Sequence, residues 1–320
     1  MYVRFVASLA ALAAGAGAVV VVVLLVRTVP GPTSTSSTST ASATPAHPGI
    51  EGGRIATPDS PGFPSPPPGA IVLSQEAGDR ALALAVMPGL VRVSVLSPEG
   101  PGASGLKVSL RFGRGYLMAA DACGPGCYQS KVEGTPNSPV SVIVNGTAYA
   151  FELPKMSAPD ASAIVAHAAS VWNALHTLTW HERLASDPTT ALHTVYRAVA
   201  PDELAYTIAG ESASVIIGNT RWDRSTPNAS WRASVQDPPV RQPQPFWQEA
   251  FDARLLGTGH VGGRSVWHVS FFDPATPSWF EAWIDQNTYR TLMLDMTTAS
   301  HFMHDIYGPF DAPMRLHAPK

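Results

Sequence analysis

Two cysteines are the side chains best suited to covalent chemistry, and they stand four positions apart in the segment Cys123-Gly-Pro-Gly-Cys127. A turn that brings their Cα atoms within about 7 Å allows a disulfide, and oxidation is the default outside the cytoplasm. A metal or redox role is the alternative, but the Cys-x-x-Cys spacing is missing and no histidine is near in sequence. We predict that Cys123 and Cys127 form a structural disulfide that pins a turn.

A second set of reactive side chains lies near the C-terminus and comprises Met296, His301, Met303 and His304. Thioethers and imidazoles suit copper, and both histidines share one face if this piece is helical. Methionine and histidine near the end of a domain also serve as packing and surface residues. Copper handling in the cell envelope is therefore kept as an alternative function, and no metal site is assigned.

Motifs of common enzymes are missing from the sequence. Residues 257–262 match the letters of a dinucleotide fingerprint, but a strand pattern follows where that fingerprint needs a helix, so a hairpin turn is predicted. His181-Glu182 is followed by Ala185 where a zinc protease would carry its second histidine. We predict a protein that is not an enzyme and needs no cofactor.

The N-terminal segment predicts the location. Residues 5–26 carry no charge, and as a helix they would span about 33 Å, enough to cross a bilayer. We predict that residues 1–27 are a single-pass anchor in the plasma membrane with a cytoplasmic N-terminus, because the terminal amine and Arg4 outweigh Arg27. A cleaved signal peptide is the alternative. In both cases the bulk of the chain is extracytoplasmic.

The amino-acid composition separates a linker from the folded part of the chain that follows it. Residues 28–70 are rich in proline, serine and threonine and are predicted to be a disordered linker. The formal net charge of −3 over 320 residues gives no electrostatic argument for a nucleic-acid partner. The partners expected are a membrane and a lipid or acylated protein, while the oligomeric state is left open.

Two folded regions follow the linker. Residues 71–155 show short apolar runs, expected as strands over 81–87, 91–96, 106–112, 140–144 and 148–153, with a hairpin at Asn145-Gly146. This pattern predicts a small antiparallel β-sandwich domain. Residues 160–316 begin with a helix over 161–178, which Asp160 can cap, and continue as antiparallel strands. A helix or turn is expected over 246–253 and a short helical turn over 299–307.

The second region resembles a known family. Stretches 196–206 and 215–224, followed by Trp231, resemble the lipoprotein-carrier family of LolA and its mycobacterial lipoprotein relatives, and stretches 269–274, 279–285 and 289–292 fit the same scheme. The resemblance covers about residues 160–312. It implies an antiparallel half β-barrel closed over a helix, with a hydrophobic concave face that shelters acyl chains and no catalysis. Residues 70–155 resemble the small β-sandwich at the C-terminal end of some bacterial copper-resistance membrane proteins.

The expected fold is therefore α+β and all-β: a transmembrane helix, a small antiparallel β-sandwich, and an antiparallel half β-barrel packed on a helix. Alternation along the later strands predicts an apolar face wider than one helix can cover, and the excess should line a cavity that binds a lipid or acyl chain. The alternative is an ectodomain with a structural or sensory role whose core binds no ligand. The predicted ligand-binding residues are Leu204, Tyr206, Ile208, Trp267, Val269, Phe271, Phe280, Ile284, Leu292, Leu294 and Met296.

Overall fold

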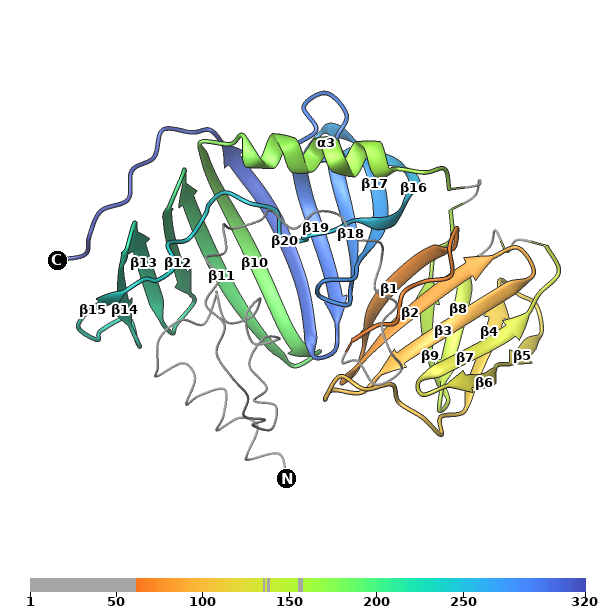
Figure 1. Cartoon of the computed structure of the whole chain (residues 1–320). Coiled ribbons are helices and arrows are strands. Elements are labelled where there is room, and N and C mark those ends of the chain that lie inside the picture. Colours follow the sequence, from red (N-terminus) through yellow and green to blue (C-terminus); the bar gives the residue numbers. More distant parts are fainter. Residues whose placement is uncertain (1–61, 135, 137–138, 155–157) are drawn as a thin grey trace, which may run out of the picture. The chain divides into compact units, whose positions relative to one another are not determined.

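The computed structural model describes residues 62–134, 136, 139–154 and 158–320. The predicted anchor and most of the predicted linker fall in residues 1–61, outside the described residues. Within the described part, no helix has the length and apolar character needed to span a membrane. Most of the described chain forms antiparallel strands, and Figure 1 shows their order.

Residues 71–151 form two small antiparallel sheets, which accords with the predicted sandwich. One sheet has the order β1 (Ile71–Ala77), β2 (Arg80–Met87), β3 (Leu90–Leu96), β7 (Cys127–Lys131), β6 (Asp121–Gly124). The other has the order β5 (Leu117–Ala119), β4 (Val108–Phe112), β8 (Val140–Val144), β9 (Thr147–Phe151). Asn145 and Gly146 join β8 to β9 with positive φ angles of 49° and 91°, as the predicted two-residue hairpin requires.

The interior of the sandwich is mainly aliphatic. Alternate residues of β3, Val91, Val93 and Val95, are fully buried against Leu82 and Leu84 of β2, and side chains of β4 and β8 complete the cluster. Every second residue of β3 therefore points into this core, as the alternation of apolar residues in the sequence predicts.

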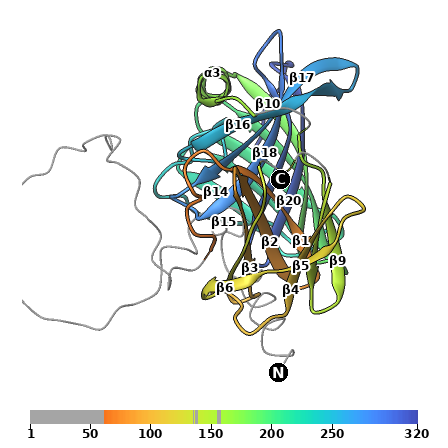
Figure 2. The ribbon, with the colours of Figure 1, turned by 90° about the vertical axis from the view of Figure 1, so that its right-hand side faces the viewer.

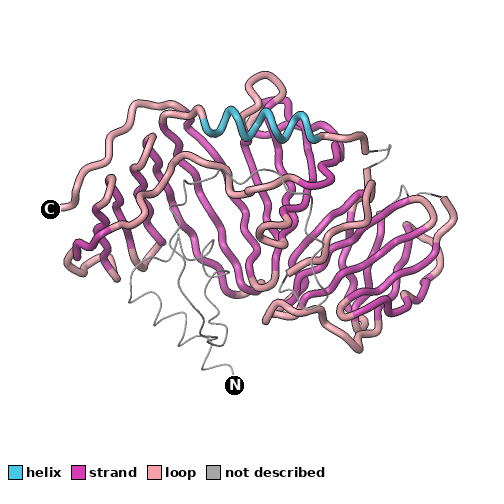
Figure 3. Tube along the Cα trace, in the orientation of Figure 1, coloured by secondary structure: helices cyan, strands magenta, loops and turns pink. Residues whose placement is uncertain are grey.

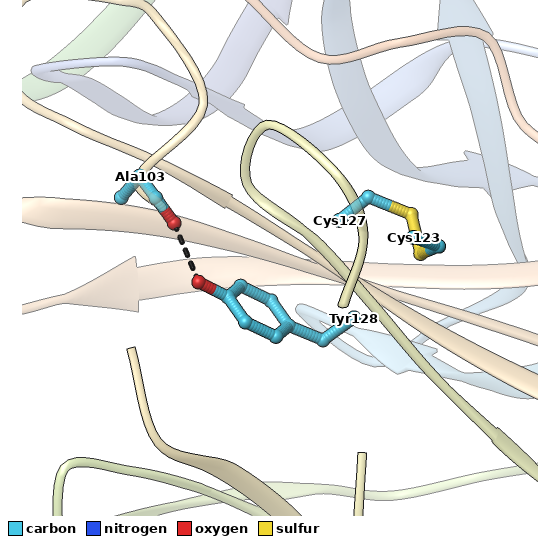
Figure 4. Close-up of a disulfide and its surroundings, with 4 residues drawn as sticks. All are labelled: Ala103, Cys123, Cys127 and Tyr128. Atoms are coloured by element: carbon cyan, nitrogen blue, oxygen red, sulfur yellow. Dashed lines mark hydrogen bonds between the residues drawn. A yellow bond between two sulfur atoms is a disulfide. The ribbon is translucent and has the colours of Figure 1, made fainter. Parts of the chain in front are cut away.

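The predicted disulfide between Cys123 and Cys127 is present, with the two Cα atoms 5.0 Å apart. Beside it, the Tyr128 hydroxyl donates to the Ala103 carbonyl at 2.8 Å (Figure 4). The disulfide therefore closes the turn between β6 and β7. The residue that follows it, Tyr128, is hydrogen-bonded to the loop that precedes β4.

Residues 177–310 form one sheet of eleven antiparallel strands. Its order is β15 (Arg232–Val235), β14 (Thr220–Arg224), β13 (Ala213–Ile217), β12 (Glu203–Ile208), β11 (Thr190–Val199), β10 (Thr177–Asp187), β20 (His301–Phe310), β19 (Thr291–Thr298), β18 (Ser278–Asp285), β17 (Arg264–Asp273), β16 (Phe251–Val261). The helix α3 (Ser162–Asn173) lies across these strands (Figures 1 and 3). Figure 2 shows this helix nearly end-on. The arrangement is consistent with the predicted half barrel.

The helix differs from its prediction in length. It begins where Asp160 accepts hydrogen bonds from the backbone N and the hydroxyl of Ser162, at 3.1 and 3.0 Å. It ends at Asn173, before the predicted end at residue 178, because Thr177 already belongs to β10. That strand pairs with β11 on one side and β20 on the other, and these ladder hydrogen bonds outweigh the helical pattern.

Two other predicted elements, a short helical turn over 299–307 and a helix or turn over 246–253, differ in the structure. Residues 301–310 form β20, in place of a helical turn, because they fill the position between β10 and β19. Residues 246–250 have no regular structure, and β16 begins at Phe251. The predicted hairpin near residue 262 is confirmed, with its turn at Gly262-Gly263 between β16 and β17.

The sandwich packs against the sheet through a separate apolar cluster. Val72 of β1 and Ala83 of β2 share this cluster with Phe272, Trp279 and others of the large sheet. Both described regions belong to one compact unit, so the predicted boundary between two domains stays a prediction.

Candidate functional site

The face of the large sheet that contacts α3 is called the inner face here. Trp172 of α3 packs edge-on against Tyr307 of β20, with ring centroids 4.7 Å apart, and His167 stacks on Tyr289 at 3.9 Å. Tyr289 in turn contacts Trp267 of β17 at 5.0 Å. These contacts identify which alternate residues of each strand belong to the inner face.

The strand register places ten of the eleven predicted ligand-binding residues on this one face, and Leu292 lies at a register shift between β18 and β19. Phe280 of β18 pairs with Phe271 of β17 on one side and with Met296 of β19 on the other. Ala282 of β18 pairs in the same way with Val269 and with Leu294. Trp267 pairs with Ile284, and Leu204, Tyr206 and Ile208 follow the same alternation on β12. The structure therefore brings these residues onto a common surface, while their role in binding stays a prediction.

This surface is covered. Phe271, Phe280 and Leu294 are at most 1% exposed. Besides α3, residues 236–250, called the crossing segment here, run over the strands between β15 and β16 (Figure 1). Its Trp247 lies 5.2 Å from the Phe271 ring, 6.3 Å from Phe280 and 5.6 Å from Trp172. The side chain of Trp247 thus packs over the place where the sequence predicts a cavity.

A hollow of about 250 Å³ lies elsewhere, at one end of the sandwich. Its wall includes Arg80 in the β1–β2 hairpin and Asn145 and Tyr149 in the β8–β9 hairpin. None of the eleven predicted residues contributes to this wall. A ligand in contact with both Phe271 and Phe280 would have to displace the Trp247 side chain, which packs against both rings.

The centre of the inner face is polar. Glu182 of β10 and Asp305 of β20 face each other as paired residues in adjacent strands, and they are 7% and 0% exposed. The Tyr196 hydroxyl donates to Glu182 Oε1 at 3.0 Å, and the Tyr307 hydroxyl donates to Asp305 Oδ2. We call these four residues the acidic cluster.

Burial determines the protonation of this cluster. Desolvation raises the pKa of Glu182 to about 7, against the opposing effect of the hydrogen bond from Tyr196. Desolvation, reinforced by the charge of Glu182, also raises the pKa of Asp305 well above its ordinary value. Two carboxylates this close cannot both ionise cheaply, so the pair retains a proton near neutral pH.

Aromatic side chains surround the acidic cluster. Trp180 stacks on Tyr196 with ring centroids 4.5 Å apart and planes inclined by 6°, and it lies 6.3 Å from Tyr307. Within the part of the chain that is described, Trp172 Nε1, Trp180 Nε1 and Asp305 Oδ1 are buried and have no hydrogen-bond partner. Such unsatisfied groups are uncommon in a core and call for an explanation.

A second polar group lies at the β12–β14 end of the inner face. Arg221, 4% exposed, donates to the Tyr206 hydroxyl at 2.8 Å and to Ser214 Oγ at 3.0 Å, and its Nε forms an ion pair with Asp223 at 2.7 Å. Tyr206, predicted as a ligand contact, is therefore already engaged through its hydroxyl. This charge is neutralised within the protein, unlike the carboxyls of the acidic cluster.

The four residues of the copper alternative are only partly brought together. Because residues 301–310 form a strand, His301 and His304 lie on opposite faces, and His304 Nδ1 contacts Asp295 Oδ1 at 2.5 Å. Met296 and Met303 are paired in register on the inner face, with His301 on the same side. The predicted pairing of the two histidines was wrong because it relied on helical spacing.

Sequence reasoning missed Glu182, Asp305, Trp180 and Tyr307. Residues 178–184 alternate as Leu, Thr, Trp, His, Glu, Arg, Leu, which is a strand pattern interrupted by one acidic residue on its apolar side. This alternation of apolar and polar residues could have predicted the strand β10 from the sequence. The pairing of Glu182 with Asp305 carried no sequence signal, because it depends on β20 returning to lie beside β10.

No protein-family model matches the sequence, and no curated protein matches it. Similar solved structures include LprF from Mycobacterium bovis (TM-score 0.38, 9% identity), covering 50% of this chain and 96% of that chain. A LolA superfamily protein from Nitrosomonas europaea has a TM-score of 0.24 and 9% identity, covering 49% and 96%. A putative outer membrane lipoprotein-sorting protein domain from Vibrio parahaemolyticus has a TM-score of 0.25 and 10% identity, covering 48% and 93%.

The resemblance to this group, predicted from the sequence, is thus found again among solved structures. All three TM-scores lie below 0.5, so the likeness carries no argument about what this chain binds. The similarity of residues 70–155 to a copper-resistance sandwich stays a prediction.

Proposed function

We propose that this protein binds a lipid or the acyl chain of a lipoprotein on its inner face and catalyses no reaction. The observation that carries the proposal is the apolar half of that face, on β17, β18 and β19, which is covered by α3 and by a segment without regular secondary structure. An acyl chain would take the place of Trp247 over Phe271 and Phe280.

The crossing segment is weakly tied to the sheet. Four of its fifteen residues are prolines, which lack a backbone N–H to donate. The backbone N–H groups of Gln236, Gln242 and Gln248 anchor it to Asn219, Pro201 and the Asp273 carboxylate, at 2.8, 3.0 and 2.9 Å. Moving the part between Gln242 and Gln248 would break few ladder hydrogen bonds, so the exchange of Trp247 for a ligand has a modest enthalpic cost.

Apolar burial supplies the driving force. Each methylene removed from water contributes about 0.8 kcal/mol, so ten methylenes give roughly 8 kcal/mol before ordering costs and the loss of the Trp247 contacts are subtracted. Because the ligand replaces a side chain already in contact, the net affinity depends on how much longer the chain is than the indole. Long acyl chains should bind and short ones should not.

The proposal includes the membrane. We propose that residues 1–27 remain as a single-pass anchor and that residues 62–320 lie outside the cytoplasm, which suits handover of lipid near one membrane better than transit between two. The support is the uncharged run of residues 5–26. Mature protein that begins near residues 28–45 would refute the anchor, and resistance to external protease in whole cells would refute the orientation.

A photoactivatable fatty acid tests the binding. The full chain in membrane vesicles is exposed to diazirine-labelled palmitate, irradiated and digested, and the labelled peptides are identified by mass spectrometry. We expect labelling on peptides of β17–β19 and of the crossing segment, and an increase of several fold in the Trp247→Ala variant. Trp231→Ala is the matched control, because Trp231 lies outside this face and contacts Arg224.

The same experiment separates the proposal from its alternative. If palmitate labels the sandwich and the inner face equally, or does not label the folded chain, the face is a closed core. The protein would then be the ligand-free structural or sensory ectodomain.

Copper handling is the second candidate, supported by the pairing of Met296 with Met303 and by His301 on the same face. His301 Nδ1 contacts the Ala299 carbonyl at 3.2 Å, an arrangement that orients an imidazole for metal binding through Nε2. Copper(I) titration of the full chain and of a Met303→Leu variant decides this candidate: equal uptake by both would exclude the site.

A further inference from the structure

The acidic cluster has no counter-ion. Within the described residues, neither Glu182 nor Asp305 takes part in an ion pair, although seven other pairs are formed. Paired burial of acidic groups without a cation is costly. Asp305 Oδ1 has no hydrogen-bond partner in this part of the chain and Asp305 is fully buried, so the carboxyl retains capacity for a donor.

The surroundings of these carboxyls suit a cation. The rings form a chain of contacts, with Trp172 against Tyr307, Tyr307 against Trp180 and Trp180 against Tyr196, at centroid distances of 4.7, 6.3 and 4.5 Å. The two tyrosines donate to the two carboxyls. Aromatic faces next to carboxylates attract an ammonium group through its charge, and the attraction is strongest where water is excluded. The cluster thus offers both acceptors and aromatic faces in one place.

The cluster also lies at one end of an apolar row. Asp305 pairs with Leu294, Leu294 with Ala282 and Ala282 with Val269, so the row crosses from β20 to β17. Three steps between neighbouring strands cover about 14 Å. A hydrocarbon chain laid along this row would have its polar end at Asp305 and its tail near Val269 and Phe271.

We infer that the acidic cluster receives the protonated primary amine of an amphiphilic ligand, whose hydrocarbon chain lies along the row from Leu294 to Val269. This inference rests on the proposed function and specifies its ligand class: a long-chain amine or a lipid with a primary amine head, in preference to a free fatty acid. The ammonium group would donate to Glu182 and Asp305 and contact Trp180. A fatty acid would bring a further negative charge to this pair of carboxyls, and like charges there repel.

Two probes with the same chain and different heads test the inference. Diazirine-labelled hexadecylamine and diazirine-labelled palmitic acid are applied at pH 7.5 to the full chain in membrane vesicles, with sandwich peptides as the internal reference. We expect the amine to label inner-face peptides about tenfold more than the acid. The double variant Glu182→Gln/Asp305→Asn should lose this preference, while Glu211→Gln, an exposed residue between β12 and β13, should retain it.

The outcomes are distinct. Equal or stronger labelling by the acid in the unaltered chain overturns the inference but leaves acyl binding in place. Persistence of the amine preference in the double variant also overturns it, because the charge removed was then not the cause. Labelling by neither probe refutes the proposed function and the inference together. Because both substitutions preserve side-chain size and remove a buried charge, the variant is expected to fold, and Asp305→Asn alone provides a second measurement.

Discussion

The interior of the sandwich and the inner face of the large sheet are both buried, yet they are built differently. The sandwich core is mainly aliphatic, with Phe151 and Tyr128 as its buried aromatic residues. The Tyr128 hydroxyl donates to the Ala103 carbonyl and accepts from the Leu106 N–H at 3.0 Å. The inner face buries Glu182, Asp305 and Arg221 among several aromatic rings, and some of its polar atoms have no partner within the described chain. A core that only needs to be stable has no use for such groups. Binding of a ligand at the inner face, as proposed above, would account for this difference in composition.

The largest expected effect concerns packing on the inner face. Phe271 is fully buried between Trp247 and Phe280, at ring distances of 5.2 and 5.3 Å. Phe271→Ala should lower the free energy of unfolding by about 3–5 kcal/mol, because it removes these contacts and leaves a cavity. Chemical denaturation measures this loss. A loss below about 1 kcal/mol would mean that the crossing segment already collapses readily into empty space.

The second largest effect is a pH dependence of the stability, which we expect from the inner face and not from the sandwich. The pKa of Glu182 is raised to about 7 in the folded chain, so the folded state holds a proton that the unfolded state releases near pH 4.5. This contribution to stability is complete below pH 4.5 and is lost as the pH rises through 7, by on the order of 3 kcal/mol. The melting temperature should therefore fall between pH 5 and pH 8, and Glu182→Gln should flatten this dependence.

The control for this prediction is Glu211→Gln, which alters an exposed carboxyl. It should leave the pH dependence of the melting temperature unchanged. A Glu182→Gln variant with the slope of the unaltered chain would show that Glu182 does not titrate in this range.

A smaller effect is expected in the sandwich. Replacement of Cys123 and Cys127 by serine opens a ring of five residues, which on the chain-entropy estimate costs about 2 kcal/mol. The loss should appear in the sandwich, and acyl-probe labelling of the inner face should be unaltered. Two free thiols in the denatured, non-reduced protein would contradict the disulfide itself.

The smallest effect concerns a single hydroxyl. Tyr128→Phe removes the bonds to the Ala103 carbonyl and the Leu106 N–H, which should reduce the free energy of unfolding by about 1 kcal/mol. Urea denaturation of the variant measures it. No change would indicate that water replaces the hydroxyl, and the sandwich core would then be less closed than its aliphatic packing suggests.

The sequence alone determined the features that depend on local periodicity. Alternation along 204–208, 267–271 and 294–296 correctly placed these side chains on one face, because a strand turns successive residues to opposite sides. The Asn145-Gly146 hairpin and the Cys123 to Cys127 ring were predictable for the same reason, since both are set by a few adjacent residues.

Tertiary structure alone decided which strands become neighbours and what covers the inner face. Residues 301–307 have a helical pattern by spacing, but they become β20 because two strands offer unpaired edges on either side. That pairing places Asp305 opposite Glu182, and it separates His301 from His304. Trp247 fills the face because the chain must cross from β15 to β16 at the other edge of the sheet. Such long-range pairings depend on the burial of the whole sheet, which no short stretch of sequence records.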